Sequence, residues 1–278
     1  MDIVVETRGL GKNFTKVIAL ADLNLTLKQG EIFGLLGPNG SGKTTLIKIL
    51  LGVLFPTKGS VRVLGQDPRD ISIKYRIGFL PETPQYYPFL NPVEVLDFFA
   101  RLFNIPKKLR KIRIEELINL VSLSDYRKRR LGAFSKGMLQ RMGLAVSLIN
   151  DPDFLLLDEP TVGLDPLGAF QVRDLLLKLK AEGKTILLCS HLLSEVESAC
   201  DKIAVLYKGV LVKEGRLSEL LKKDDEIQIN IKTKEPAIRD KILALIKNIE
   251  ETEVDIGYPN QSLDELFRSI IKDSENVK

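Results

Sequence analysis

The chain has 278 residues, 44% of them hydrophobic and 28% charged, and its formal net charge is +4. This length is sufficient for one large domain or for a domain with an appendage, and either can bury a sizeable core. The mild positive charge argues against nucleic acid as a partner, because nucleic-acid binders usually concentrate positive charge strongly.

No segment of the sequence predicts secretion or membrane insertion. The N-terminal stretch MDIVVETRGLGKNF lacks the apolar run of a signal peptide, and no later run approaches the roughly 20 apolar residues that span a bilayer. Cys189 and Cys200 are the only cysteines and show no CxxC spacing, which favours two free thiols in a reducing cytosol. We therefore expect a protein that is soluble or reaches a membrane only through a partner.

Two short strands, Ile3–Thr7 and Leu23–Leu27, are predicted near the N-terminus, broken by the turn residues Gly9 and Gly11. An antiparallel flap is the simplest arrangement for them. Phe14 lies between polar neighbours in this flap, where its ring can stack on a purine, although an isolated phenylalanine is more often a core residue.

The stretch from Glu31 to Val53 joins an apolar strand, a glycine loop and an amphipathic helix without a gap. The loop matches G-x-x-x-x-G-K-[ST], whose glycines let backbone amides converge on phosphate oxygens. The residues of the loop and the start of the helix are Gly37, Pro38, Asn39, Gly40, Ser41, Gly42, Lys43, Thr44 and Thr45. The apolar face of the helix comprises Leu46, Ile49, Leu50 and Val53. We expect Lys43 to neutralise the β- and γ-phosphates of a nucleotide and Thr44 to ligate Mg²⁺. A chance match is the weaker interpretation, because strand, loop and helix stand in the required order.

A further strand at residues 76–80 ends in a polar loop bounded by prolines. This loop places Glu82 at the carboxyl edge of the sheet, where open α/β sheets bind ligands. The following region, residues 84–150, is interpreted as a helical subdomain inserted into the α/β core. Its two predicted apolar faces comprise Val93, Leu96, Phe99 and Leu102, and Ile114, Leu117, Ile118 and Val121.

Basic residues cluster within the predicted insertion at positions 107–113 and 127–130. A solvated face is the favoured interpretation, and a surface for anionic lipid or an acidic partner is the alternative. The insertion ends with a helix for which Ser135 is a natural N-cap, and Gly137 exposes amides at its dipole-positive end. Such an end can bind an anion, but taken alone an ordinary cap is the more frequent explanation.

Two adjacent carboxylates, Asp158 and Glu159, follow the apolar strand at residues 154–157. Uncompensated acids at the end of a buried strand are costly, which indicates a functional role. Asp158 can hold Mg²⁺, and Glu159 can reach the water that attacks a γ-phosphate. A turn that contains Asp165 then starts a helix expected at residues 167–180.

His191, the only histidine, follows the buried strand predicted at residues 185–189 and shares a sheet edge with the acids above. This position favours a hydrogen bond to the γ-phosphate or to the attacking water. Two last strands are predicted at residues 201–207 and 209–213. From about Leu217 the pattern restarts with alternating isoleucines at 227–231 and helical stripes at 238–249 and 263–271, which indicates a small α+β appendage for docking or dimer contacts.

Together and in this order, the motifs resemble the ATP-binding subunits of ABC transporters over residues 3–221. Phe14 matches the A-loop aromatic, GPNGSGKT the Walker A loop, Asp158-Glu159 the Walker B pair, Asp165 the D-loop aspartate and His191 the H-loop histidine. The resemblance implies an α/β fold, with a P-loop NTPase core, a parallel sheet and an N-terminal antiparallel flap. It assigns residues 1–217 to the ATP-binding domain, with the insertion at about 84–150, and residues 218–278 to the appendage.

The resemblance also implies that two subunits enclose two ATP molecules head to tail. Ser135, Lys136, Gly137 and Met138 stand where the family carries its signature, and would face the γ-phosphate bound by the other subunit. Lys136 is electrostatically favourable there, whereas Met138 forfeits a polar contact. Glu82 replaces the usual Q-loop glutamine; it can still ligate Mg²⁺, but it adds negative charge beside Glu159.

We therefore expect a Mg²⁺-dependent ATP hydrolase that powers transport, with export favoured, through a separate transmembrane permease. Glu159 would be the general base, Lys43 and His191 would stabilise phosphoryl charge, and the metal ligands would be Thr44, Asp158 and Glu82. The working form would be a homodimer or heterodimer, cytoplasmic and peripheral on the membrane. The alternatives are an ABC-type ATPase acting on DNA or ribosomes, which would need a coiled-coil insertion or a second cassette, and a regulatory module that binds ATP without hydrolysing it.

Overall fold

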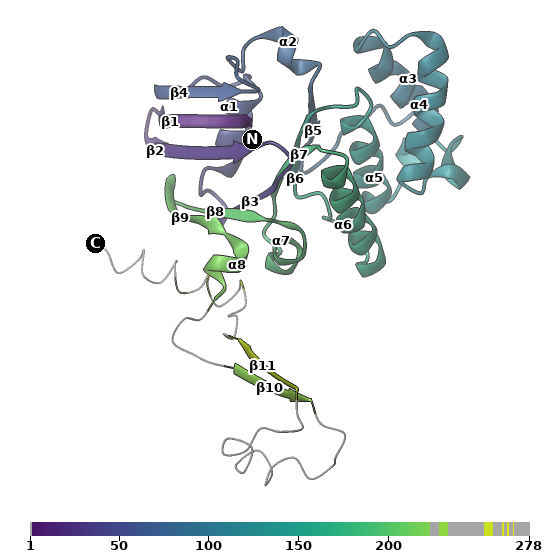
Figure 1. The fold of residues 1–278 in the computed structure, drawn as a ribbon. Helices are drawn as coiled ribbons and strands as arrows, with labels where there is room; N and C mark the ends of the chain where they lie inside the picture. The colour runs from purple at the N-terminus through teal and green to yellow at the C-terminus, as the bar shows by residue number, and fades with distance from the viewer. Residues whose placement is uncertain are drawn as a thin grey trace.

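The computed structural model describes residues 2–222, 228–232 and 253–257, together with Leu263, Leu266 and Ser269 (Figure 1). The N-terminal part is an antiparallel sheet in the order β2-β1-β4. Its strands are β1 (Ile3–Phe14), β2 (Val17–Lys28) and β4 (Lys58–Val63). The predicted flap is confirmed, but the expected strand ends are wrong. Gly9 and Gly11 lie inside β1 at shifts of register, because a bulge accommodates the left-handed backbone of Gly9 without ending the strand.

The main sheet has the strand order β5-β6-β7-β3-β8-β9. Its strands are β3 (Ile32–Leu36), β5 (Ile77–Leu80), β6 (Phe154–Asp158), β7 (Thr185–Cys189), β8 (Lys202–Tyr207) and β9 (Val210–Arg216). Neighbouring strands from β5 to β8 are parallel, and β9 alone pairs antiparallel, with β8. Every residue of β3, β6 and β7 is buried, which explains why these strands are continuous apolar runs in the sequence.

Alternate residues of the main sheet face two separate cores. Phe33 and Leu35 of β3 belong to the core that includes the N-terminal sheet and α1 (Lys43–Leu50). Ile32 and Leu36 belong to the core on the other face, which includes the helical insertion and α6 (Pro166–Ala181). Helix α1 ends before the predicted last apolar residue, Val53, which is 70% exposed. The remaining short helices are α2 (Ile71–Lys74), α7 (Leu193–Ala199) and α8 (Leu217–Leu220).

The inserted subdomain consists of α3 (Pro92–Leu102), α4 (Lys107–Leu120) and α5 (Lys136–Ser147), with two short 3₁₀ turns before α5. The predicted face of α4 is confirmed, since Ile114, Leu117, Ile118 and Val121 are all buried. The predicted face of α3 is partly wrong. Leu96 is buried, but Leu102 is 58% exposed and Val95 is buried instead, because α3 packs against both α4 and α5 and its buried stripe is turned toward them.

The C-terminal region contributes to the main core at two described positions. Leu263 and Leu266 are buried in the same cluster as Leu217 and Leu221. Strands β10 (Gln228–Lys232) and β11 (Glu253–Gly257) pair antiparallel. The alternating isoleucines predicted the first of these strands, but the second strand and the pairing were not predicted. The helical stripe predicted at residues 238–249 lies outside the described residues.

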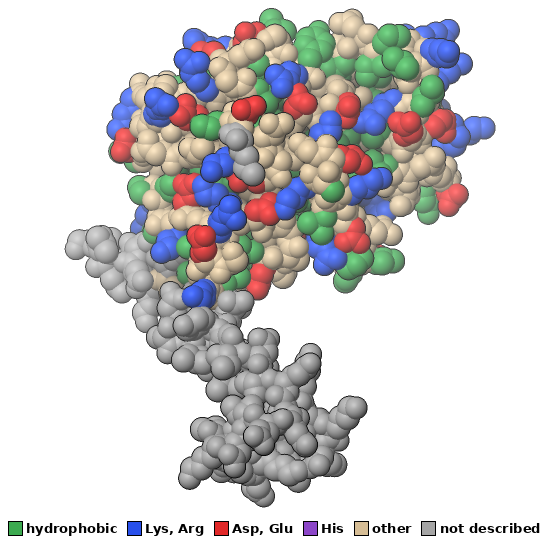
Figure 2. All heavy atoms as spheres, in the orientation of Figure 1, with side chains coloured by type: hydrophobic (Ala, Val, Ile, Leu, Met, Phe, Trp, Pro, Cys, Tyr) green, Lys and Arg blue, Asp and Glu red, His purple; other side chains and the backbone are tan. Residues whose placement is uncertain are grey.

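Charges of both signs are interspersed over the face drawn in Figure 2, with basic side chains at the end formed by α3 and α4. Part of the basic cluster is paired within the subdomain: Arg110 contacts Asp97 at 3.1 Å, and Arg127 contacts Glu115. Lys107, Lys108 and Lys111 are exposed. Among the helices that the structure describes, none combines the length and the apolar character needed to cross a membrane.

Candidate functional site

The glycine loop between β3 and α1 contains two glycines, Gly37 and Gly42, at which an added side chain would clash with the backbone. Gly42 caps α1 with a φ of 111°, and a Cβ atom there would lie 2.6 Å from the Ala19 carbonyl oxygen. A Cβ atom on Gly37 would lie 2.3 Å from the Leu206 carbonyl oxygen. Within the described part of the chain no side chain caps α1, so its first N–H groups stay available at the dipole-positive end of the helix. This cradle fits an anion such as a phosphate.

The loop also holds one positive charge and one unused hydroxyl. The ammonium group of Lys43 donates hydrogen bonds to the carbonyl oxygens of Gly37 at 2.6 Å and Pro38 at 3.2 Å. The buried Ser41 hydroxyl has no hydrogen-bond partner among the residues that the structure describes. A buried polar atom without a partner is costly, so a ligand oxygen that bonds to Ser41 would remove that cost. The loop therefore fits the phosphates of a nucleotide.

Acidic residues gather across the pocket from this loop. Asp158 ends β6 and is 9% exposed, and burial together with the charges of Glu159 and Glu82 raises its pKa to about 6, against the opposing effect of Lys43. A divalent cation would relieve this repulsion. The oxygen donors that line the same pocket, namely Thr44, Glu82 and Asp158, fit Mg²⁺, which takes one or two carboxylates and completes its shell with water and phosphate oxygens.

Glu159 follows β6 in an uncommon backbone conformation. Its φ is 53°, in the left-handed region that costs a non-glycine residue roughly 1–2 kcal/mol. Its N–H group donates to the Cys189 carbonyl oxygen at 2.8 Å, and its own carbonyl oxygen accepts from the Gln140 side chain at 2.8 Å. The carboxylate oxygen Oε2 lies 2.8 Å from Nδ1 of His191. Such retained strain is typical of residues whose side chain must point in a defined direction.

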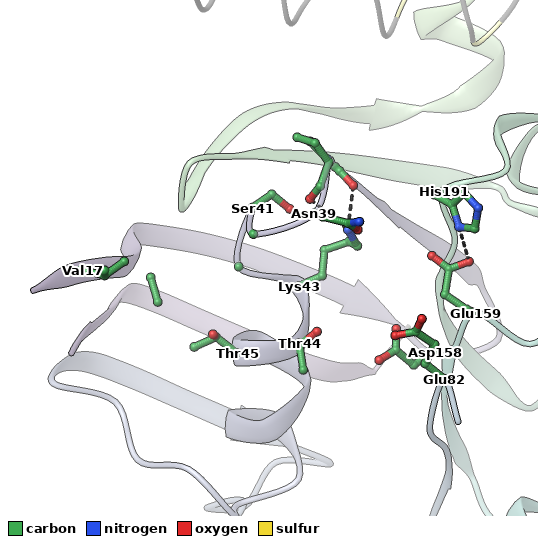
Figure 3. A pocket seen from close by; sticks show the side chains of 15 residues that line it. Val17, Asn39, Ser41, Lys43, Thr44, Thr45, Glu82, Asp158, Glu159 and His191 are labelled. Atoms are coloured by element: carbon green, nitrogen blue, oxygen red, sulfur yellow. Dashed lines mark hydrogen bonds and ion pairs between the residues drawn. The ribbon is translucent and has the colours of Figure 1, made fainter. Parts of the chain in front are cut away.

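These groups line one pocket of about 450 Å³ (Figure 3). The structure brings together the predicted residues Gly37, Pro38, Asn39, Gly40, Ser41, Gly42, Lys43, Thr44, Thr45, Glu82, Asp158, Glu159 and His191. In Figure 3, the glycine loop and α1 bring Ser41, Lys43 and Thr44 to one side, and the ends of the strands bring Asp158, Glu159 and His191 to the other.

Phe14 does not line this pocket. Its ring is 48% exposed, and the ammonium group of Lys12 lies 5.1 Å from the ring centroid. Val17 and Ala19 of β2 line the pocket instead. Sequence reasoning missed them because small apolar residues in a strand carry no chemical signal of their own. The role of Phe14 in stacking on a purine stays a prediction.

The predicted signature residues Ser135, Lys136, Gly137 and Met138 do not line the pocket of their own chain. The Ser135 hydroxyl accepts a hydrogen bond from the Met138 N–H at 3.2 Å and so caps α5. Asp165 in the same way caps α6, accepting from the Gly168 N–H at 2.8 Å. These contacts give both residues a structural role, and their roles toward a nucleotide stay predictions.

Known proteins resemble this chain in sequence. Residues 20–162 match the family described as ABC transporter. An ABC transporter ATP-binding protein of Nostoc sp. is 53% identical over 208 residues, which are 74% of this chain and 62% of that protein. The chain thus covers less than two thirds of the Nostoc protein. The bacitracin transport ATP-binding protein BcrA of Enterococcus faecalis is 39% identical over 227 residues, which are 81% of this chain and 73% of BcrA.

Solved structures resemble it in fold. A structure described as an ATP-binding subunit of an ABC transporter matches with a TM-score of 0.77 and 26% identity, covering 96% of this chain and 99% of that chain. A dimeric ATP-binding cassette in a post-hydrolysis state, bound to ADP and Pi, matches with a TM-score of 0.71 and 26% identity. The match covers 77% of this chain and 98% of that chain. The matched structures share the nucleotide-binding α/β architecture described above.

Proposed function

Because this chain belongs to the ABC transporter family of ATP-binding proteins, we propose that it hydrolyses Mg-ATP to drive transport through a separate membrane permease. The observation that carries this proposal is the 2.8 Å contact between Glu159 and His191, in a pocket that Lys43 and the glycine loop also line. A module that only binds ATP would need the loop but not a carboxylate held by a histidine beside it.

The loop would bind the triphosphate with its own groups. Lys43 would exchange the carbonyl oxygens of Gly37 and Pro38 for phosphate oxygens, and Ser41 would gain the partner it lacks. Mg²⁺, held by Thr44, Asp158 and Glu82, would supply further neutralisation of phosphate charge. This arrangement would stabilise negative charge on the phosphoryl oxygens with groups that already line the pocket.

Glu159 would act as the general base that accepts a proton from the attacking water. Glu159 and the glycine loop line the same pocket, so its carboxylate would reach a water that attacks the terminal phosphate, and the contact with His191 would orient the carboxylate. His191, with its side chain 59% exposed, can also donate a hydrogen bond to the phosphoryl group. The two roles for His191 differ in which ring nitrogen carries the proton.

The partners and location extend the proposal. Ser135, Lys136, Gly137 and Met138 would complete the site of a second subunit, and a permease would hold the dimer at the cytoplasmic face of the membrane. The relative BcrA is named for bacitracin transport, which supports a role in transport, and we propose export as its direction. The transported substrate would be determined largely by the permease.

The test is phosphate release from Mg-ATP by the wild type and by Glu159→Gln. We expect the substitution to lower kcat by at least about 10²-fold with ATP still bound, because a positioned base typically contributes 10²–10⁴-fold. Glu182→Gln, a matched change at an exposed position, should leave kcat unchanged. Turnover of Glu159→Gln within about threefold of wild type would contradict the assignment, and ATP binding by the wild type without phosphate release would support the regulatory alternative.

A further inference from the structure

Gln140 is a buried amide on α5 that neither caps a helix nor lines the pocket. Its side chain is 1% exposed, and its Nε2 atom donates a 2.8 Å hydrogen bond to the backbone carbonyl oxygen of Glu159. A carbonyl oxygen only accepts, so this partner determines which end of the amide faces Glu159. The bond joins the helix of the predicted signature to the residue that carries the base.

Hydrogen bonds to both its N–H group and its carbonyl oxygen hold the backbone of Glu159 in the left-handed conformation. The N–H group is bonded to the Cys189 carbonyl, and the carbonyl oxygen accepts from Gln140 and also, at 3.2 Å, from the Val162 N–H. The direction of the carboxylate depends on this conformation, because the side chain leaves from the same Cα atom. Without the Gln140 amide, the Glu159 carbonyl oxygen would still accept from the Val162 N–H group. We therefore expect the Glu159 peptide to shift in position, and not to be left without a hydrogen bond.

A second contact ties the same face of α5 to the segment after Glu159. A Cβ atom on Gly137 would lie 2.7 Å from the Gly163 carbonyl oxygen, so the helix and this loop touch through backbone at that point. Gly137 and Gln140 are three residues apart and therefore share one face of the helix. The first turns of α5 and residues 159–163 are thus packed as one unit.

We propose that Gln140 is a positioning residue for Glu159 and couples the N-terminal end of α5 to the base in the same chain. The inference rests on the proposed role of Glu159. Contact with a partner at the N-terminal end of α5 would displace this helix. The Gln140 amide would then move the Glu159 peptide and turn the carboxylate. A nucleotide bound by a second subunit, in contact with the end of α5, would in this way affect the orientation of Glu159 in this chain.

The test replaces Gln140 by methionine, which has a similar length but no N–H donor. We expect kcat for ATP hydrolysis to fall at least tenfold while KM for ATP stays within twofold, because the phosphate loop is untouched. Ser147→Ala is the matched control. Ser147 is also buried on α5, and its hydroxyl donates to the Leu144 carbonyl within the same helix, so both constants should stay within twofold.

A double-mutant cycle separates positioning from a general structural effect. If Gln140 acts through Glu159, adding Gln140→Met to Glu159→Gln should lower single-turnover hydrolysis by less than twofold further. An unchanged kcat in Gln140→Met, a parallel loss of ATP affinity, or an independent tenfold loss in the double variant would each overturn the inference. If Gln140→Met does not fold, Gln140→Asn, whose amide is too short to reach Glu159, takes its place with the same expectations. Glu159→Gln alone tests the base, so failure of the proposed function is recognised separately.

Discussion

At the scale of a single residue, the ionised carboxylate of Asp158 lowers the stability of the folded protein. Burial and two neighbouring carboxylates raise its pKa from 3.8 to about 6, so the folded state binds its proton more tightly than the unfolded chain does. Between these two pKa values the folded state carries more protons, and stability falls as pH rises. Above about pH 6 the full cost is present, which we place at about 1–2 kcal/mol after allowing for partial solvent screening.

Asp158→Asn should therefore stabilise the nucleotide-free protein at pH 8. We expect a Tm higher than that of wild type by roughly 2–6 °C, and a difference that shrinks toward zero at pH 4, where the wild-type carboxyl is protonated when folded. Calorimetry without Mg²⁺ or ATP at both pH values measures this. If the variant and the wild type had equal Tm values at pH 8, or if their difference in Tm persisted at pH 4, the ionised Asp158 would not be the cause of a stability cost. The same variant should lose hydrolysis, because stability is gained at the expense of a residue that we propose as a metal ligand.

Residues with a chemical signature were predictable, and residues defined by their neighbours were not. Lys43, Asp158, Glu159 and His191 follow buried strands or a glycine loop, and parallel strands bring such ends to one sheet edge. Gln140 escaped prediction because its partner is a backbone carbonyl, which any residue could supply.

At the scale of elements, the glycine loop that joins β3 to α1 needs a residue without a side chain at position 42. Gly42→Ala would place a Cβ atom 2.6 Å from the Ala19 carbonyl oxygen at a φ of 111°, so the loop and β2 must separate. We expect ATP affinity to fall at least 100-fold. Gly183→Ala is the matched control, since Gly183 has a φ of +86° and no described atom lies within 4 Å of its added Cβ atom. It should cost about 1 kcal/mol of stability and leave ATP binding unchanged, as measured by titration calorimetry. Similar affinities for the two variants would contradict this account.

Elements were predictable where their periodicity was local. The runs at β6 and β7 indicated buried parallel strands because both faces of the main sheet are covered. The length of β1 was underestimated, since a glycine that ends a strand and a glycine in a bulge look alike in sequence. The face of α3 was misjudged because its burial depends on two neighbouring helices, and one helical period cannot show both contacts.

At the scale of the whole molecule, the pocket and the predicted signature residues Ser135–Met138 lie apart within one chain, and we propose that a second copy completes the site. The pocket opens between the glycine loop and the strand ends, and α5 directs its capped end elsewhere, with Lys136 exposed. A second copy that brings Lys136 to the terminal phosphate would add a positive charge where the pocket has only Lys43 as a cation among its lining residues. Assembly would then depend on bound nucleotide, because without the phosphates the two loops and helix ends repel through their lysines.

The corresponding prediction concerns the mass of the protein in solution. Glu159→Gln, which should bind ATP without consuming it, is expected to be a monomer alone and a dimer with Mg-ATP when measured by size-exclusion chromatography with light scattering. Adding Lys136→Glu should weaken this dimer at least tenfold, because a carboxylate would face the phosphate. Lys128→Glu, the same charge reversal at another exposed position of the subdomain, should not. A mass that stays monomeric while ATP is bound would exclude a homodimer and direct the search to a heterodimer partner. Equal effects of the two reversals would mean that net charge, rather than contact at the end of α5, controls assembly.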